Sequence, residues 1–264
     1  MRIIKKLLIG ALPLMTLWLT SNASAQLAAE LQSQPPITAS RNLLGLGVGA
    51  FPEAPGSSDA RVIGLPVLQY TFGDLGYVAG LKAGVWGYSS NDRSLRIGLY
   101  AEPRFGYDGG DNPITAGMSN RSFAINAGPS LRWSTPAGVL SFDYGFDVSN
   151  RSDGQLAQLQ FIRPLVSEVG LRLNGLVGAT WQNAAMNNYY WGGNAIEATA
   201  NRAAYAAGAG VGLSVGLTGL YAFGPTSALF YGATINRLAS PQVNSPITER
   251  SFTPLLYLGY GWRM

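Results

Sequence analysis

The sequence predicts an all-β protein, an antiparallel transmembrane β-barrel of a bacterial outer membrane. Three observations support this fold class: an N-terminal export signal, a series of segments in which apolar and polar residues alternate, and a last segment that carries the same alternation. Hydrophobic residues make up 47 % of the chain and charged residues only 12 %. After residue 25 no stretch approaches twenty apolar residues, so strands rather than helices must cross the membrane.

The first 25 residues have the layout of a secretory signal peptide. Basic residues at the start precede an apolar stretch over about 7–19, and small residues follow up to Ala25. We expect cleavage after Ala25, a periplasmic leader over residues 26–40, and a barrel over residues 41–264. The alternative is that the first 25 residues are retained as an amphipathic membrane anchor.

The charge of the exported chain excludes one class of partner. Three of the 18 basic residues and none of the 14 acidic residues lie before position 26, which leaves 15 against 14. No basic patch remains to contact phosphates, so we expect no nucleic-acid partner. The chain contains no Cys, which excludes disulfides and thiolate metal sites.

Period-two alternation is clearest between residues 140 and 148. Leu140, Phe142, Tyr144 and Phe146 occupy even positions, whereas the odd positions hold Ser, Asp and Gly. The same pattern recurs near residues 95–104, 121–133, 169–182, 206–216 and 228–236. A soluble antiparallel sandwich also alternates. The export signal, the length of the runs and the aromatic residues near their ends favour a membrane barrel.

The end of the chain predicts a final strand with one apolar face. The residues of that face are Phe252, Leu256, Leu258, Tyr260, Trp262 and Met264, and Pro254 interrupts the pattern. Gly259, Trp262 and Met264 resemble an outer-membrane targeting pattern, in which the last residue is usually aromatic.

Eleven strand-like runs can be counted, with starts near 42, 61, 77, 94, 121, 139, 155, 168, 206, 228 and 251. A bacterial barrel with both ends in the periplasm needs an even number. We therefore predict twelve strands, with ten as the alternative. The missing strand could come from a break within 205–223 or a short strand within 183–204. Tight turns at 73–76, 135–138 and 224–227 should face the periplasm, and long connections at 107–120, 183–204 and 239–250 the outside.

Eight charged residues share the predicted inner face of the barrel. They are Lys82, Arg96, Glu102, Arg104, Arg132, Asp143, Asp147 and Arg172. They could form a network of salt bridges that fills a narrow lumen, or they could line a selective pore. The first interpretation is preferred.

No residue pattern predicts catalysis, and we expect no catalytic residue, cofactor or metal. The chain has no His, which Ser-His and Asp-His mechanisms require. Gly212–Gly216 spells G-x-S-x-G, but Ser214 lies in an alternating run, so it is interpreted as a small residue facing the lumen. Asp143 and Asp147 lie four residues apart on one strand, roughly 13 Å, which is too far for a shared-proton pair.

Several segments resemble the MipA/OmpV family of MltA-interacting outer-membrane proteins. They are the glycine-rich Leu44–Pro52, the Ala54–Asp59 loop, Arg61–Leu68 with its Leu-Pro pair, Asn188–Gly192 and Asn236–Pro241. The resemblance implies a non-enzymatic barrel that contacts outer-membrane lipid. It also implies a scaffold for a murein transglycosylase and a peptidoglycan synthase, with a porin-like channel or a surface adhesin as alternatives. The oligomeric state stays open.

Overall fold

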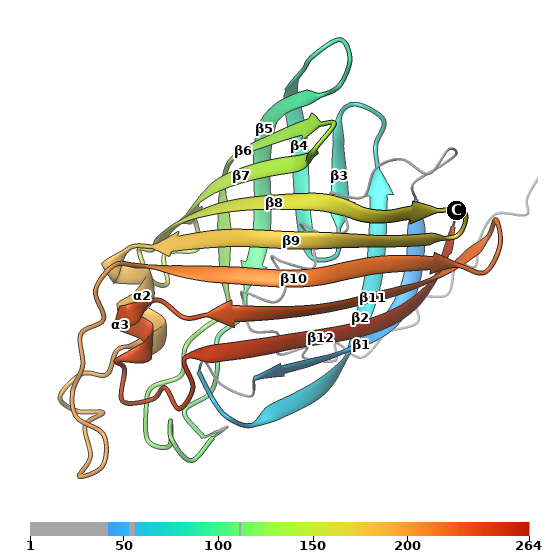
Figure 1. The fold of residues 1–264 in the computed structure, drawn as a ribbon. Helices are drawn as coiled ribbons and strands as arrows, with labels where there is room; N and C mark the ends of the chain where they lie inside the picture. Colours follow the sequence, from blue (N-terminus) through green and yellow to red (C-terminus); the bar gives the residue numbers. More distant parts are fainter. Residues whose placement is uncertain (1–41, 53–55, 111, 264) are drawn as a thin grey trace, which may run out of the picture.

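The computed structural model describes residues 42–52, 56–110 and 112–263, which form a closed antiparallel barrel of twelve strands (Figure 1). This confirms the predicted fold class and the preferred strand number. The strands are β1 (Leu43–Pro52), β2 (Ala60–Thr71), β3 (Gly76–Ala79), β4 (Lys82–Ser89), β5 (Leu95–Arg104), β6 (Ala124–Thr135), β7 (Gly138–Asp147), β8 (Gln155–Glu168), β9 (Leu171–Gln182), β10 (Gly210–Ala222), β11 (Ser227–Arg237) and β12 (Phe252–Arg263).

The predicted signal peptide, the cleavage site after Ala25 and the leader over 26–40 lie outside the described residues. Within the described ranges, no helix combines the length and the apolar content needed to cross a membrane.

Each strand pairs with the next along the chain, and β1 pairs with β12 to close the ring. The closing register places Leu44 opposite Trp262 and Ala50 opposite Leu256. The start of β1 and the end of β12 therefore lie at one end of the barrel, and the helices α2 (Ala184–Trp191) and α3 (Ser240–Val243) lie at the other (Figure 1).

The alternation in the sequence corresponds to the two faces of the wall. In β7, Phe142 and Phe146 are 39 % and 44 % exposed, whereas Asp143 and Asp147 between and beside them are buried. In β12, Leu256, Leu258 and Trp262 point outward and are about half exposed. Because successive side chains in a strand point to opposite faces, one apolar set covers the outside of the barrel and the other set packs inside.

The twelfth strand arises where the sequence analysis did not place it. The run that begins near residue 77 divides at Gly80 and Leu81 into β3 and β4. Gly80 has a φ of 59°, a conformation that costs glycine little, and its amide donates to the carbonyl of Leu68 at 2.7 Å. The tight turn is possible because of this one glycine.

Both predicted sources of the missing strand are therefore wrong. The segment 205–223 contains the single strand β10, which begins only at Gly210. The segment 183–204 contains the helix α2 instead of a strand. The side chain of Asn183 accepts a hydrogen bond from the amide of Met186, an N-cap that starts a helix before two alanines.

The long connections gather at one end of the barrel, and most of the short turns lie at the other. The end that holds the start of β1 carries the short turns 72–75, 90–94, 136–137, 169–170 and 223–226. The opposite end carries the long connections 105–123, 183–209 and 238–251. We call these two ends the turn end and the loop end.

An apolar cluster occupies the barrel interior near the turn end. It consists of Leu43, Val67, Tyr77, Ala79, Leu220, Ala228 and Phe230, with Trp86, Ala222 and Tyr257 packed against it. The Tyr77 ring lies over Gly84, where a Cβ atom would approach its Cζ to 2.5 Å. The missing side chain of Gly84 therefore makes room for an aromatic ring inside a narrow barrel.

Candidate functional site

Three of the eight charged residues predicted for the lumen meet in one buried cluster. Lys82 begins β4, and its ammonium group forms a hydrogen-bonded ion pair with Asp143 of β7. Glu102 of β5 lies 4.0 Å from the same nitrogen. The side chains of Lys82, Glu102 and Asp143 are 2 %, 5 % and 8 % exposed. We call these three residues the inner charge cluster.

The inner charge cluster lies against aromatic side chains. The Lys82 ammonium lies 4.2 Å from the centre of the Tyr100 ring, close enough for a cation–π interaction. Polar residues of the same inner face, Asn126 and Ser130, are also buried. The barrel interior is thus filled with side chains at this level, which supports the interpretation of a salt-bridge network over that of a pore lining.

The other five charged residues have separate surroundings. The guanidinium of Arg104 lies 4.3 Å from the centre of the Tyr190 ring on α2, so it links the wall to the loop end. The Asp147 carboxylate accepts hydrogen bonds from the amides of Ser149, Arg151 and Ser152 and therefore shapes the following loop.

The three remaining arginines, Arg96, Arg132 and Arg172, belong to β5, β6 and β9. Arg96 lies 5.9 Å from the Trp86 ring and 3.9 Å from Asp74, which belongs to the turn end. Arg132 stands opposite Arg96 in the register of β5 and β6. The carbonyl of Arg172 accepts a hydrogen bond from the Tyr231 hydroxyl, and its side chain is half-buried.

Ser214 does not have the setting of a catalytic serine. It lies in the middle of β10, opposite Gly178 of β9 and Asn236 of β11. A nucleophile elbow requires a sharp turn from a strand into a helix. Among the described residues, no group of three or more His, Cys, Asp or Glu side chains could hold a metal ion.

The long connections pack against one another and cover the loop end. The Tyr107 hydroxyl donates to the Tyr190 carbonyl at 3.0 Å, and the Ser245 hydroxyl donates to the Trp191 carbonyl at 2.5 Å. The guanidinium of Arg202 donates to the carbonyls of Ile114 and Ala116 at 2.7 and 3.1 Å. We call the segments 105–123, 183–209 and 238–251 together the loop cap.

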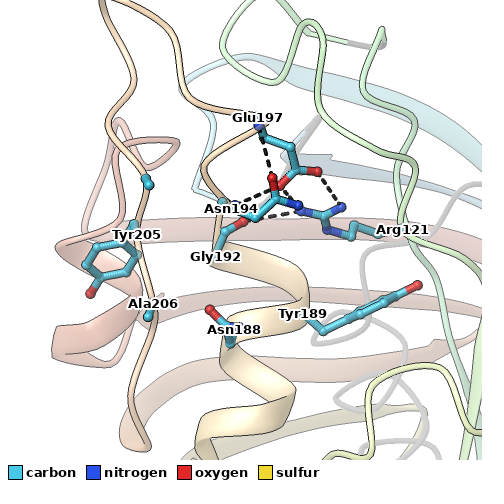
Figure 2. Close-up of a pocket in the computed structure, with 10 residues that line it drawn as sticks. Arg121, Asn188, Tyr189, Gly192, Asn194, Glu197, Tyr205 and Ala206 are labelled. Carbon is cyan, nitrogen blue, oxygen red and sulfur yellow. Dashed lines mark hydrogen bonds and ion pairs between the residues drawn. The ribbon is translucent and has the colours of Figure 1, made fainter.

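The loop cap contains an open pocket of about 520 Å³ (Figure 2). Arg121 and Glu197 form one part of its lining, and Asn188, Tyr189 and Tyr205 form another. The two ends of the Arg121 guanidinium donate to the two oxygens of Glu197 at 3.0 and 3.1 Å. This two-point contact fixes the relative position of two loops that are 76 residues apart.

Hydrogen bonds make Glu197 an unusually strong acid. Burial opposes its charge, but Arg121 and the amides of Ser119 and Asn194 donate to its carboxylate, at 2.8 Å from Ser119 and 3.1 Å from Asn194. These donors outweigh burial and lower the pKa of Glu197 to about 2. The carboxylate therefore stays charged at any ordinary pH and holds the loop cap together.

Polar atoms around the pocket mainly brace the loops. The Tyr189 hydroxyl accepts from the amide of Ser122 at 2.8 Å, and the Tyr205 hydroxyl donates to the carbonyl of Pro241 at 2.7 Å. The Asn188 side chain accepts from the amide of Ala207 at 3.2 Å. The pocket is thus a depression at the loop end whose lining residues are held by hydrogen bonds.

The pairing of Arg121 with Glu197 and the helix α2 were not predicted from the sequence. Asn183 followed by two alanines was the one local signal for the helix. No sequence spacing could have paired Arg121 with Glu197, because their contact depends on how two separate loops fold.

Two solved structures that match this chain share little sequence with it. A FadL homologue from Pseudomonas aeruginosa is 9 % identical, with a TM-score of 0.44 over 92 % of this chain and 98 % of that one. An outer-membrane channel from Pseudomonas putida is 12 % identical, with a TM-score of 0.39 over 88 % and 97 % of the two chains.

Sequence relatives are more informative. The MltA-interacting protein of Escherichia coli is 25 % identical over 223 residues, which cover 83 % of this chain and 89 % of that protein. The outer membrane protein Omp26La of Vibrio anguillarum is 28 % identical over 144 residues, 54 % of this chain and 55 % of that protein. The second of these names agrees with the outer-membrane location expected from the sequence.

The family comparison covers almost the whole described barrel. The model of the family described as MltA-interacting protein MipA matches residues 44–264, from the second residue of β1 to the end of the chain. The resemblance noted from short segments is therefore confirmed, and the chain belongs to the MipA family of outer-membrane β-barrel proteins.

Proposed function

We propose that this barrel is a non-enzymatic scaffold that binds peptidoglycan-remodelling enzymes at the periplasmic side of the outer membrane. The proposed partners are a murein transglycosylase and, with it, a peptidoglycan synthase. The name of the Escherichia coli relative, MltA-interacting protein, supports the first of these partners. We assign the turn end to the periplasm because short turns face that side in bacterial barrels.

The observation that carries this proposal is two highly exposed apolar side chains in separate turns of the turn end. Leu75, in the turn between β2 and β3, is 76 % exposed, and Val169, in the turn between β8 and β9, is 107 % exposed. Both lie beyond the ends of their strands. Beside Leu75, Asp74 forms an exposed ion pair with Arg93 at 2.7 Å. Leu75 is thus an exposed apolar side chain with charged neighbours, a composition that protein interfaces often have.

The filled interior favours a scaffold over a diffusion pore. A water-filled channel leaves the side chains of its lining accessible, whereas Lys82, Glu102 and Asn126 are all at most 5 % exposed. The adhesin alternative would use the loop cap instead of the turn end, so the two ends distinguish these functions.

The proposal can be tested by capture of a purified MltA-type transglycosylase on the full-length mature barrel in lipid nanodiscs. We expect the double substitution Leu75→Ser and Val169→Ser to reduce retention at least several-fold. Ile196→Ser is the matched control, because Ile196 is 94 % exposed but lies in the loop cap. A barrel without residues 26–40 tests whether the leader adds to binding.

Planar-bilayer recordings complete the test. We expect no steady single-channel conductance from the wild-type barrel. Steady conductance, combined with failure to retain the transglycosylase, would replace the scaffold with a pore.

A further inference from the structure

The barrel wall is incomplete on one side, between β2 and β5. β3 pairs with β2 only at Gln69, Tyr70 and Thr71, although β2 pairs with β1 as far as Ala60. β4 pairs with β5 only as far as Ala101, although β5 pairs with β6 as far as Arg104. In the described chain, residues 60–67 of β2 and 102–104 of β5 therefore have no strand partner on their facing sides.

The size of this gap follows from the spacing of strands. β3 and β4 both stop at the turn of Gly80 and Leu81. Two strands are therefore missing from the part of the wall that lies nearer the loop end. Three spacings of about 4.8 Å leave about 14 Å between β2 and β5 at that level. On the loop-end side of the gap, the side-chain amide of Asn112 donates to the Ser57 hydroxyl at 3.3 Å and joins the flanking loops. We call this gap the lateral window.

Two prolines mark the edges of the lateral window. The Leu68 carbonyl accepts from Gly80, so it points toward β3, and Pro66, two residues earlier, points the same way. The Leu95 carbonyl accepts from Ser90 on the β4 side, and Pro103, an even number of residues later, also points there. Both prolines thus place a nitrogen without a hydrogen at an edge that no strand covers, which is where a sheet tolerates proline.

Apolar side chains fill the lateral window from within. Ile63 of β2, Leu81 of the turn and Phe105 beyond β5 come from three of its sides and pack against Phe51 and Leu255, which are each 2 % exposed. On the outer side, Val62 is 72 % exposed, and a Cβ atom on Gly64 would meet no atom within 4 Å. Side chains alone, without a hydrogen-bonded ladder, separate the interior from the outer surface here.

We propose that the lateral window is an entry site for the hydrocarbon chain of a membrane amphiphile. A hydrocarbon chain can replace Phe105 or Leu81 against Phe51 and Leu255 at little cost, because one apolar contact replaces another. A strand from a partner protein fits less well, because prolines on both edges interrupt the ladder that it would need. This inference is independent of the scaffold function, which concerns the turn end.

The wild-type chain tests the proposal directly in vesicles of phosphatidylcholine that carries a photoreactive diazirine midway along its acyl chain. Mass spectrometry after illumination should find label on Ile63, Leu81 or Phe105, as well as on outward residues such as Val215. Leu176 is the matched control, because it is an inward leucine whose strand is paired on both sides. Label confined to outward residues would overturn the proposal.

A cross-link across the lateral window provides a second, independent test. The chain contains no cysteine, so Ile63→Cys with Phe105→Cys introduces the only thiols. Because a disulfide cannot span about 14 Å, a thiol-reactive cross-linker of about that length with a cleavable centre joins the two cysteines. After cross-linking we expect labelling of Leu81 to fall several-fold and to recover when the linker is cleaved, whereas labelling of Val215 stays constant. Heat-dependent migration in gels confirms that the variant is folded. Unchanged labelling of Leu81 in the cross-linked form would contradict entry through the window.

Discussion

The hydroxyl group of Tyr100 on β5 occupies the space that a Cβ atom on Gly145 of β7 would need. The Tyr100 side chain crosses the inner face of β6 to reach this point, because β6 lies between β5 and β7. Tyr100 is only 2 % exposed, and the Lys82 ammonium lies over its ring. A glycine on one strand therefore positions an aromatic residue that shapes the inner charge cluster.

Gly145→Ala should destabilise the barrel by about 1–3 kcal/mol, the usual cost of overpacking a filled interior. Urea unfolding of the refolded barrel in vesicles measures this. Adding Tyr100→Phe should recover part of the loss, because the next atom of the ring is 3.3 Å from the new Cβ. Gly64→Ala is the control, since its Cβ would meet nothing within 4 Å. Equal effects at the two glycines would contradict this packing.

Lys82→Met should destabilise the barrel more than Gly145→Ala does. It leaves the carboxylates of Asp143 and Glu102 buried without their cation, and breaking a buried ion pair typically costs about 3–5 kcal/mol. The matched control is Arg93→Met, which removes the cation of an ion pair whose side chains are 62 % and 52 % exposed. Exposed pairs contribute at most about 1 kcal/mol. Unfolding in urea should rank the two variants in this order, and a reversed order would show that Lys82 is not held by its carboxylates.

A charge on the outer face tests the orientation of β7. Phe142→Arg should cost about 2–4 kcal/mol if Phe142 faces the middle of the bilayer. From the alternation alone, Asp143→Asn should be mild, but the ion pair with Lys82 makes a clear loss the expected result. The two losses of stability can be similar in size, so the surrounding medium distinguishes the variants. Phe142→Arg should destabilise the barrel only in lipid, whereas Asp143→Asn should also destabilise it in detergent.

The pH dependence of the loop cap should follow Glu197. Its pKa is lowered from 4.5 to about 2, so its contribution to stability is complete above pH 4.5 and is lost as the pH falls toward 2. Hydrogen exchange of residues 183–209, taken relative to the intrinsic exchange rate at each pH, should increase as the pH falls across this interval in the wild type. In Glu197→Gln, exchange should already be faster at pH 7 and should change less between pH 4.5 and 2. The same pH profile in both proteins would assign the effect to other carboxylates.

Much of this barrel can be predicted from local pattern. Alternation in strands such as β7 predicts both the class of fold and the face on which Phe142 and Asp143 lie, because a strand fixes side-chain direction with a period of two residues. The absence of His can be read from the sequence in the same direct way, and it limits mechanisms that require an imidazole. Neither inference requires knowledge of which strands are neighbours across the lumen.

Only the tertiary structure decided which groups meet. Lys82 and Asp143 are 61 residues apart, and Arg121 and Glu197 are 76 residues apart. Alternation indicates that a residue faces inward but not which opposite residue it contacts, since that depends on strand register and barrel closure. The turn at Gly80 shows the same limit. One glycine divided a run that alternation treats as continuous, and the shortened strands left the lateral window, because a gap in a wall is defined by partners that do not extend far enough.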